Sequence, residues 1–563
     1  MPVSASALFI LGALVLSSVQ ALSGETYRER LSLSQLPDGT VLGVFDFNRS
    51  FSPAVLSEAQ ANHYSLLPRA IGEIIQTFEV AELHLTFTQG RYNYRKWPME
   101  PYAAPSGVEL WAWFRTADTD ARWKGLTNAL SGLFCASLNF LDETLTTSPL
   151  HSYDPEGHHA NASRADRPRS ARPGNLELRH GILSNEITCT ENLTPWAKLL
   201  PCQTKSGIAS LLNAYKIYDT EYHSMSVHVQ PQCQDAECRD WTLEVYQRLV
   251  VAVDPRRTVK QKDWSMYLLF GREIQNQCPL ATDSTVSVQK NTHSEWFASS
   301  GLALPSSESN SLEVSLSSRQ PGQIVNLGIK TPGGNLPYFS GLLPSASRIQ
   351  AHRYLVGFGA SQPGMATRLT NSDEKQSYRV VFFQTIPWYL KLYLHTLKVK
   401  TIVGSEQEGK QHQSTIYYQP SIDRVRPGIL EIEVTLPPKT ELLITVAFEY
   451  ALVRYTEHPP DSERGFQLSS GTVSYVPARC EGACRWSRIY TEPLLLALPT
   501  PDFSMPYNVI TFTCTVMALF FGSMFNALIR DFSAVKLTEK ELAELKNGSD
   551  GQSRNWLKRL LWR

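Results

Sequence analysis

At 563 residues the chain is long enough for two or three domains. Lysine plus arginine and aspartate plus glutamate balance at 53 each, so no basic field points to nucleic acid as a partner. A hydrophobic content of 42% excludes a largely disordered chain.

The first 21 residues have the pattern of a secretory signal peptide. Ala7–Leu16 are apolar, and Val19–Ala21 match a small-x-small cleavage site. The apolar stretch is too short to span a membrane comfortably. We therefore expect residues 1–21 to be removed and the following chain to enter an oxidising lumen, where cysteines can pair.

Residues 22–254 are expected to form a luminal α+β domain. Apolar residues at three- and four-residue steps predict helices over Ser65–Phe78 and Ala121–Phe134. Strand-like runs surround these helices, and a Pro-Asp-Gly turn separates the first two of them. Those runs include Val41–Phe47, Glu82–Gln89 and Glu109–Phe114. From about residue 205 to 500 the pattern is mostly strand-like, as in the alternating run Thr242–Val253.

Within this domain, residues 151–180 change in composition. They are rich in arginine, proline and glycine and contain the pair His158-His159. A histidine pair can bind a metal, but a solvated insertion loop is the preferred interpretation.

Residues 255–508 are expected to form a β-sandwich-like luminal domain, because short strand-like runs are separated by proline- and glycine-containing turns. Glu431–Leu436 and Glu441–Tyr450 flank Pro437–Lys439 and predict a long hairpin. The predicted fold class is therefore a β-rich α+β ectodomain, mainly β-sandwich-like, with one C-terminal transmembrane helix.

Residues 509–529 form that helix. The run is uncharged and, at about 1.5 Å per residue, long enough for a bilayer core of about 30 Å. Lysine and arginine follow it, so residues 530–563 are expected to be a cytosolic tail and the chain a single-pass type I membrane protein. One face of the helix carries small or weakly polar residues that favour packing against other membrane helices: Thr511, Thr515, Ala518, Gly522 and Asn526.

Eight of the nine cysteines fall on the luminal side, and their spacing leaves the disulfide connectivity open. No paired CxxC zinc pattern is present, and no metal site is expected. The candidate glycosylation sites on that side are Asn48, Asn161 and Asn192.

The sequence has no HExxH, no GxSxG and no glycine-rich dinucleotide turn, so no catalytic residue and no cofactor is predicted. Two alternatives remain open from the residues alone. The chain could be a stand-alone luminal hydrolase, or a membrane-anchored adhesion or receptor protein.

Several stretches carry a family resemblance. They are Phe134–Phe140, Cys189–Trp196 (CTENLTPW), Leu199–Cys202, Asp263–Ser265, Pro387–Tyr389, Leu394–Thr396, Tyr418–Pro420 and Tyr490–Asn508. In this order they resemble the GPI transamidase component T (PIG-T) family over nearly the whole chain.

The resemblance implies a non-catalytic subunit of an endoplasmic reticulum membrane complex that attaches GPI lipids to proproteins. It implies a disulfide from Cys189 to a caspase-like catalytic subunit, as well as other membrane subunits as partners. With Cys189 committed outward, seven luminal cysteines remain, and at least one more stays free or pairs outward. We expect that one to be Cys135, as a buried thiol.

The resemblance also implies that the stretch before the membrane helix binds the GPI headgroup, which offers an amine, hydroxyls and phosphates. Asp502 can accept from hydroxyls or pair with a cation, and Ser504 and Asn508 can donate to phosphate or sugar oxygens. The alternative is that Asp502 and Ser504 only cap the helix.

Overall fold

The computed structural model divides after Pro499 into two compact units. It describes residues 25–36, 38–52, 66–99, 103–115, 118–158, 176–233, 240–258, 260, 262–290, 294–299, 309–317, 323–330, 346–358, 362–402, 411–459, 461, 464–479, 486–500, 504–530, 536, 538–540 and 543. The expected signal peptide, Asn161, Asp502 and most of the expected cytosolic tail lie outside these residues.

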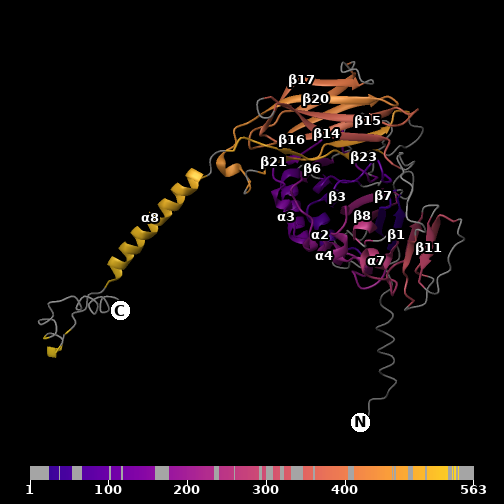
Figure 1. The fold of residues 1–563 in the computed structure, drawn as a ribbon, viewed down its shortest axis with the longest axis horizontal. Helices are drawn as coiled ribbons and strands as arrows, with labels where there is room; N and C mark the ends of the chain where they lie inside the picture. Colours follow the sequence, from indigo (N-terminus) through magenta and orange to yellow (C-terminus); the bar gives the residue numbers. More distant parts are fainter. Residues whose placement is uncertain are drawn as a thin grey trace, which may run out of the picture. The chain divides into compact units, whose positions relative to one another are not determined.

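The first unit contains a ten-stranded sheet in the order β12-β10-β1-β2-β8-β7-β3-β4-β6-β5 (Figure 1). Strands β1 and β10 run parallel, and the other adjacent pairs are antiparallel. The bounds are β1 Thr26–Gln35, β2 Val41–Phe51, β3 Val80–Gln89, β4 Gly107–Phe114, β5 Thr146–Thr147, β6 Glu177–Leu183, β7 Tyr222–Cys233, β8 Trp241–Val253, β10 Asp283–Gln289 and β12 Ser311–Ser315.

Both faces of this sheet are buried, and the alternation along β8 shows how. Leu249 and Val251 belong to the core under the helices, whereas Val250 and Ala252 belong to the core shared with the sandwich. Successive side chains of a strand point to opposite faces, so a continuous apolar run serves two cores.

Helices cover one face of the sheet (Figure 1). The two helices predicted from periodicity are present, as α2 and α3. The helices of this unit are α2 Arg69–Thr77, α3 Thr119–Phe134, α4 Thr190–Lys198, α5 Ala214–Ile217, α6 Pro255–Thr258 and α7 Met266–Phe270, with short 3-10 turns at η3 Leu138–Phe140, η4 Ile208–Leu211 and η5 Tyr455–Glu457.

Strands β10 and β12 extend the ten-stranded sheet beyond residue 254, where the sequence suggested a domain division. The segment after that position therefore contributes to the same sheet as β1. The same part of the chain also forms a small sheet in the order β11-β13-β9. Its strands are β9 Trp264–Ser265, β11 Glu295–Ala298 and β13 Leu327–Lys330.

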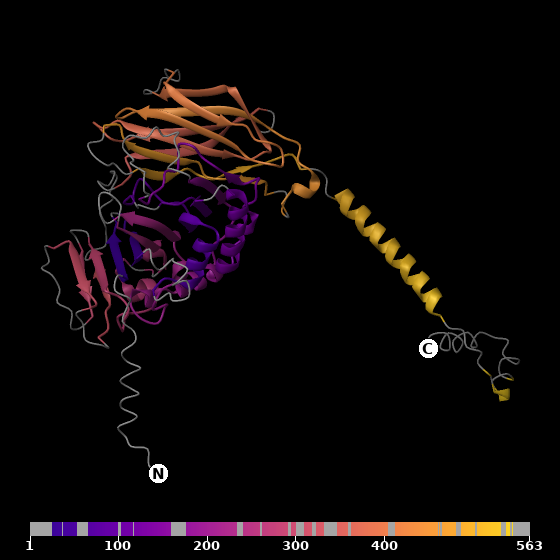
Figure 2. The same cartoon turned by 180° about the vertical axis from the view of Figure 1, so that it is seen from behind.

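A sandwich of two sheets, ordered β14-β15-β20-β17 and β18-β19-β16-β22-β23, stacks on the other face of the large sheet (Figures 1 and 2). The β-rich fold class is thus confirmed. Its strands are β14 Ile349–Phe358, β15 Gln362–Asn371, β16 Tyr378–Ile386, β17 Leu390–Ile402, β18 Ser414–Gln419, β19 Gly428–Leu436, β20 Glu441–Tyr450, β22 Thr472–Pro477 and β23 Ser487–Tyr490, with a separate pair β21 Phe466–Leu468 and β24 Leu494–Leu496.

The predicted hairpin of Glu431–Leu436 with Glu441–Tyr450 is wrong. Strand β19 pairs with β16 and β18 in one sheet, and β20 pairs with β15 and β17 in the other. The proline-containing turn therefore crosses between the two sheets. Both strands alternate in polarity because each faces the sandwich core, and this pattern is the same whether or not the strands pair with each other.

The first part of the expected insertion loop is packed, contrary to the prediction of a solvated segment. The Glu431 carboxylate accepts hydrogen bonds from the backbone nitrogens of Leu150 and His151, both at 3.0 Å, and from the Ser152 hydroxyl at 2.6 Å. Strand β6 occupies the end of the expected loop, and residues 159–175 between them lie outside the described residues.

A buried carboxylate, Glu109 on β4, joins the large sheet to the sandwich. It accepts hydrogen bonds from Tyr153 at 2.7 Å and Tyr490 at 2.8 Å, and its Oε1 lies 3.0 Å from His180 Nε2. Burial acts to raise the pKa of Glu109, but the hydrogen bond and charge of His180 and the charge of Arg488 outweigh it, so the pKa is lowered. The group therefore stays ionised inside the protein.

The second unit contains helix α8, Ser504–Ile529, the one described helix that is long and apolar enough to cross a membrane. It includes the whole predicted span 509–529 and begins five residues earlier. None of its residues is buried within this chain.

A second buried carboxylate gives a pH-dependent stability. Glu29 on β1 accepts from Ser284 at 2.5 Å and from the Ile208 nitrogen at 3.2 Å. Burial raises its pKa from 4.5 to about 7, although these hydrogen bonds oppose the shift. Between these values the folded state binds more protons than the unfolded state, so stability falls as pH rises, by about 3 kcal/mol in total.

We predict that Glu29→Gln makes the decrease in melting temperature between pH 5 and 8 shallower than in the wild type. Thermal denaturation of the full chain in detergent measures this. The exposed Glu143→Gln is the control and should keep the wild-type slope. An unchanged slope in Glu29→Gln would contradict the assignment.

Candidate functional site

Cys189 lies at the N-terminal end of helix α4, as its N-cap residue. Its thiol is free and its side chain is partly exposed. The Tyr218 hydroxyl donates a hydrogen bond to the carbonyl oxygen of Cys189. Burial raises the pKa of Tyr218, so this hydroxyl keeps its proton and remains a donor. The thiol is therefore available at the surface while its backbone is fixed.

Helix α4 itself is held rigidly against the large sheet. The indole of Trp196 is fully buried and donates to the Ser226 carbonyl at 3.0 Å, and Gln247 donates to the Trp196 carbonyl at 2.9 Å. Arg49 donates to the Leu199 carbonyl at the end of the helix, at 2.8 Å. Hydrogen bonds from two strands thus satisfy the C-terminal carbonyls that a helix leaves open.

Asn192, a candidate glycosylation site, is buried beneath this helix end and only 1% exposed. Its Oδ1 accepts from the Cys189 nitrogen at 2.8 Å, and its Nδ2 donates to the carbonyls of Phe134 at 2.9 Å and Cys135 at 3.2 Å. The nitrogen that a glycan would modify is thus occupied and covered, which argues against glycosylation at Asn192.

Asn48 lies within β2, between β1 and β8, where its side-chain nitrogen donates to Glu244 at 3.3 Å. Asn161 falls outside the described residues, so its expected glycosylation stays a prediction.

The expectation of a buried thiol at Cys135 is wrong, because this residue is free but exposed. Helix α3 ends there because Cys135 adopts the left-handed conformation, at φ 51°. The chain changes direction at this residue, and its side chain is exposed. Cys202 and Cys278 form a disulfide with Cα atoms 5.9 Å apart, and Cys233 is also disulfide-bonded.

Ser504 and Asn508, the described members of the expected lipid-binding set, lie in the first turns of α8 and are exposed. Because the helix begins at Ser504, these residues fall on the same face as Thr511 and Thr515, at steps of four, three and four. The Thr515 hydroxyl donates to the Thr511 carbonyl at 2.8 Å. A Cβ added at Gly522 would meet nothing within 4 Å, and no residue of the helix is buried. No other described part of this chain therefore covers this face.

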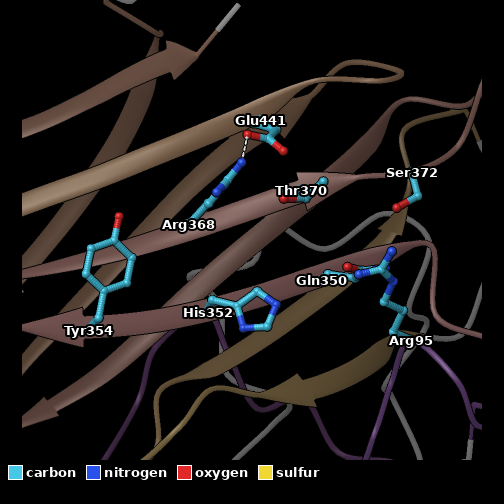
Figure 3. Close-up of a pocket in the computed structure, with 8 residues that line it drawn as sticks. All are labelled: Arg95, Gln350, His352, Tyr354, Arg368, Thr370, Ser372 and Glu441. Atoms are coloured by element: carbon cyan, nitrogen blue, oxygen red, sulfur yellow. Dashed lines mark hydrogen bonds and ion pairs between the residues drawn. The ribbon is translucent and has the colours of Figure 1, made fainter. Parts of the chain in front are cut away.

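A cavity of about 500 Å³ opens on the outer face of the β14-β15-β20-β17 sheet, and sequence reasoning did not find it (Figure 3). We call it the sheet-face cavity. Its lining residues are Arg95, Gln350, His352, Tyr354, Arg368, Thr370, Ser372 and Glu441. They come from three strands, the turn after β15 and a distant loop, so no local motif marks them. Among the described residues there is no cluster of three or more metal-ligating side chains.

Comparison with known proteins decides the family. The model of the family described as "Gpi16 subunit, GPI transamidase component" matches residues 9–263 and 255–554. The human "GPI-anchor transamidase component PIGT" is 38% identical, with 90% of this chain and 91% of the relative aligned. This chain belongs to the GPI transamidase component (PIG-T/Gpi16) family.

Other relatives agree with this membership. The Saccharomyces cerevisiae "GPI transamidase component GPI16" is 31% identical, covering 91% of this chain and 90% of the relative. The Schizosaccharomyces pombe "GPI transamidase component PIG-T homolog" is also 31% identical, covering 93% of each chain. The resemblance inferred from the motifs is thus confirmed, and this PIG-T family chain is a component of the GPI transamidase complex. Family membership implies other subunits and the endoplasmic reticulum membrane.

The burial of Asn192 leads to a paired prediction. Asn192→Ala removes three hydrogen bonds at a buried site and should lower the free energy of unfolding by about 2 kcal/mol. Thr194→Ala destroys the same glycosylation sequon but leaves the Asn192 side chain in place, so it should keep wild-type stability. Thermal denaturation of both variants tests these two expectations.

Gel mobility before and after glycosidase treatment tests whether Asn192 carries a glycan, and Thr194→Ala should migrate like the wild type. A mobility shift in Thr194→Ala would show that Asn192 is glycosylated and would overturn the prediction.

Proposed function

We propose that this chain is a non-catalytic subunit that assembles and stabilises GPI transamidase on the luminal side and helps bind the GPI lipid during its attachment to proproteins. In this proposal Cys189 forms a disulfide with a caspase-like catalytic subunit. The body of the chain lies in the lumen of the endoplasmic reticulum, and α8 crosses the membrane once with the tail in the cytosol.

The observation that carries the covalent part is the free, partly exposed Cys189 on a rigidly anchored helix. A disulfide requires its two Cα atoms within about 7 Å, so a partner must approach the thiol closely. A backbone fixed by Tyr218 and Asn192 holds the thiol in one place for that approach. Less conformational freedom is then lost when the bond forms.

The start of α8 supports the lipid-binding part. Ser504 and Asn508 are exposed, and their hydroxyl and amide groups can donate to phosphate or sugar oxygens, while Asp502 just before them can accept from hydroxyls or pair with an amine. The same face continues into the small-residue stripe from Thr511 to Asn526, which we propose packs against helices of other subunits. Lipid headgroup and partner helix would thus meet on one side of α8.

The Cys189 assignment predicts a change on non-reducing gels. Cys189→Ser should abolish a covalent heterodimer that reducing agent dissolves in the wild type. Cys135→Ser is the matched control, because Cys135 is another free and accessible thiol, and it should keep the heterodimer. Loss of the band in Cys135→Ser with retention in Cys189→Ser would transfer the role to Cys135.

The lipid-binding assignment predicts an effect on activity without an effect on assembly. Asn508→Ala should lower GPI attachment to a reporter proprotein by about fivefold to tenfold, the effect of losing a hydrogen bond worth about 1 kcal/mol or slightly more. Co-purification of the other subunits should stay at the wild-type level.

Thr513→Ala, which changes a polar residue on the opposite face of α8, is the control and should leave GPI attachment unchanged. Equal losses in both variants would indicate a general disturbance of the helix instead of a lipid contact.

A further inference from the structure

The residues that line the sheet-face cavity are distant in sequence from both Cys189 and the start of α8. The roles proposed for Cys189 and for α8 do not involve this cavity. Its position is fixed by the strand register. His352 on β14 faces Arg368 on β15, and Thr370 on β15 faces Glu441 on β20, so four outward side chains of neighbouring strands form the floor. Arg95 reaches it from the loop after β3 (Figure 3).

We propose that this cavity binds a phosphorylated glycan, with Arg95 and Arg368 on the phosphate. The inference rests on the proposed function, since it gives the chain a second contact with the GPI headgroup, in addition to the one at α8. The shared chemistry is a sugar that bears a phosphate group.

Charge is the first argument. Arginine, with its fork of N–H donors, is well suited to bind phosphate oxygens in pairs. The exposed Arg95 has no hydrogen bond or ion pair among the described residues. Arg368 pairs with the carboxylate of Glu441, but its side chain is 46% exposed, so a further anion can reach it. A phosphate monoester carries more negative charge than a carboxylate and can compete for this guanidinium.

The remaining lining suits a sugar. Gln350, Thr370 and Ser372 place an amide and two hydroxyls around the two arginines, and such groups both donate to and accept from sugar hydroxyls (Figure 3). Tyr354 is 43% exposed at the opposite end of the cavity from Ser372 and offers an aromatic face. The volume of about 500 Å³ is in the usual range of small-ligand sites.

The wall near Arg95 is built to hold its shape. Glu492 accepts from His352 Nδ1 at 2.9 Å and from the Arg353 backbone nitrogen at 2.8 Å, and it pairs with Arg91 at 2.5 Å. His352 is therefore held at the cavity by a carboxylate behind it. A preformed wall lowers the entropy lost when a ligand binds.

The same sheet carries a second, separate hollow of about 500 Å³, further along the same strands. At this hollow four residues on neighbouring strands are paired in one row: Val356, Gly364, Ala447 and Tyr393. The two inner residues are small and the two outer ones are larger, so the sheet surface forms a trough between them. Several linked sugar rings could therefore lie along this face, as an extended glycan requires.

The test is the affinity of the full chain, purified in detergent with its complex, for mannose 6-phosphate, measured by isothermal titration calorimetry. Arg95→Ala and Arg368→Ala should each weaken binding by at least about tenfold, equal to about 1.4 kcal/mol. Glu441→Gln should strengthen it, because it releases Arg368 from its carboxylate. Arg379→Ala removes an arginine on the other sheet of the sandwich and should have no effect.

Mannose and inorganic phosphate, measured alongside, separate the sources of affinity. Mannose 6-phosphate binding more tightly than either supports the proposal. Equal binding of inorganic phosphate would overturn the proposal in favour of a simple anion site. If Arg379→Ala weakened binding as much as the cavity variants do, overall positive charge would explain the binding and the proposal would be wrong. Weakened binding in Glu441→Gln would show that the ion pair only maintains the fold.

Failure of this proposal is distinguishable from failure of the proposed function. The cavity variants should retain the Cys189-dependent heterodimer and the co-purifying subunits, whatever happens to glycan binding. If those are lost as well, the fault lies in assembly of the complex and the cavity assignment is rejected.

Discussion

The structure depends on one buried charge, the Glu109 carboxylate between the large sheet and the sandwich. An unpaired ionised group in a protein interior costs several kcal/mol, and removing one partner of a buried pair typically costs about 3–5 kcal/mol. Tyr153 and His180 approach it from the large-sheet side and Tyr490 from β23 of the sandwich. Arg488 stacks over Tyr153 with its guanidinium carbon 4.4 Å from the ring centroid. Satisfying this charge therefore requires both parts to be folded and in contact.

This constraint suits the proposed role, in which the chain holds other molecules. A subunit that positions a partner needs surfaces whose geometry does not change, and here the surface at Cys189 and the sheet-face cavity are each held by several polar contacts. Cys189 is fixed through Asn192 and through the indole of Trp196 on the sheet below. The sheet-face cavity is fixed through Glu492, which lies two residues after the end of β23. Tyr490, which donates to Glu109, and Glu492, which holds the cavity wall, therefore belong to one short segment of the chain.

Buried carboxylates appear with two different outcomes in this fold. Partner donors and positive charges keep Glu109 ionised, because they outweigh the effect of burial. At Glu29 burial dominates, and the pKa rises to about 7. The difference follows from what surrounds each group. His180 and Arg488 bring positive charge to Glu109, whereas Ser284 and the Ile208 backbone offer Glu29 only neutral donors.

The sequence by itself determined the long apolar C-terminal helix, helices α2 and α3, the β-rich class and the family, because these depend on local periodicity or on motifs of adjacent residues. Tertiary structure alone decided the pairing of β19 and β20, since alternating polarity specifies a buried face but not the neighbouring strand. It also decided that Asn192 is buried, that Cys135 is exposed, and that Arg95 and Arg368 line one cavity. Burial and proximity depend on which distant segments pack together, and no short stretch of sequence contains that information.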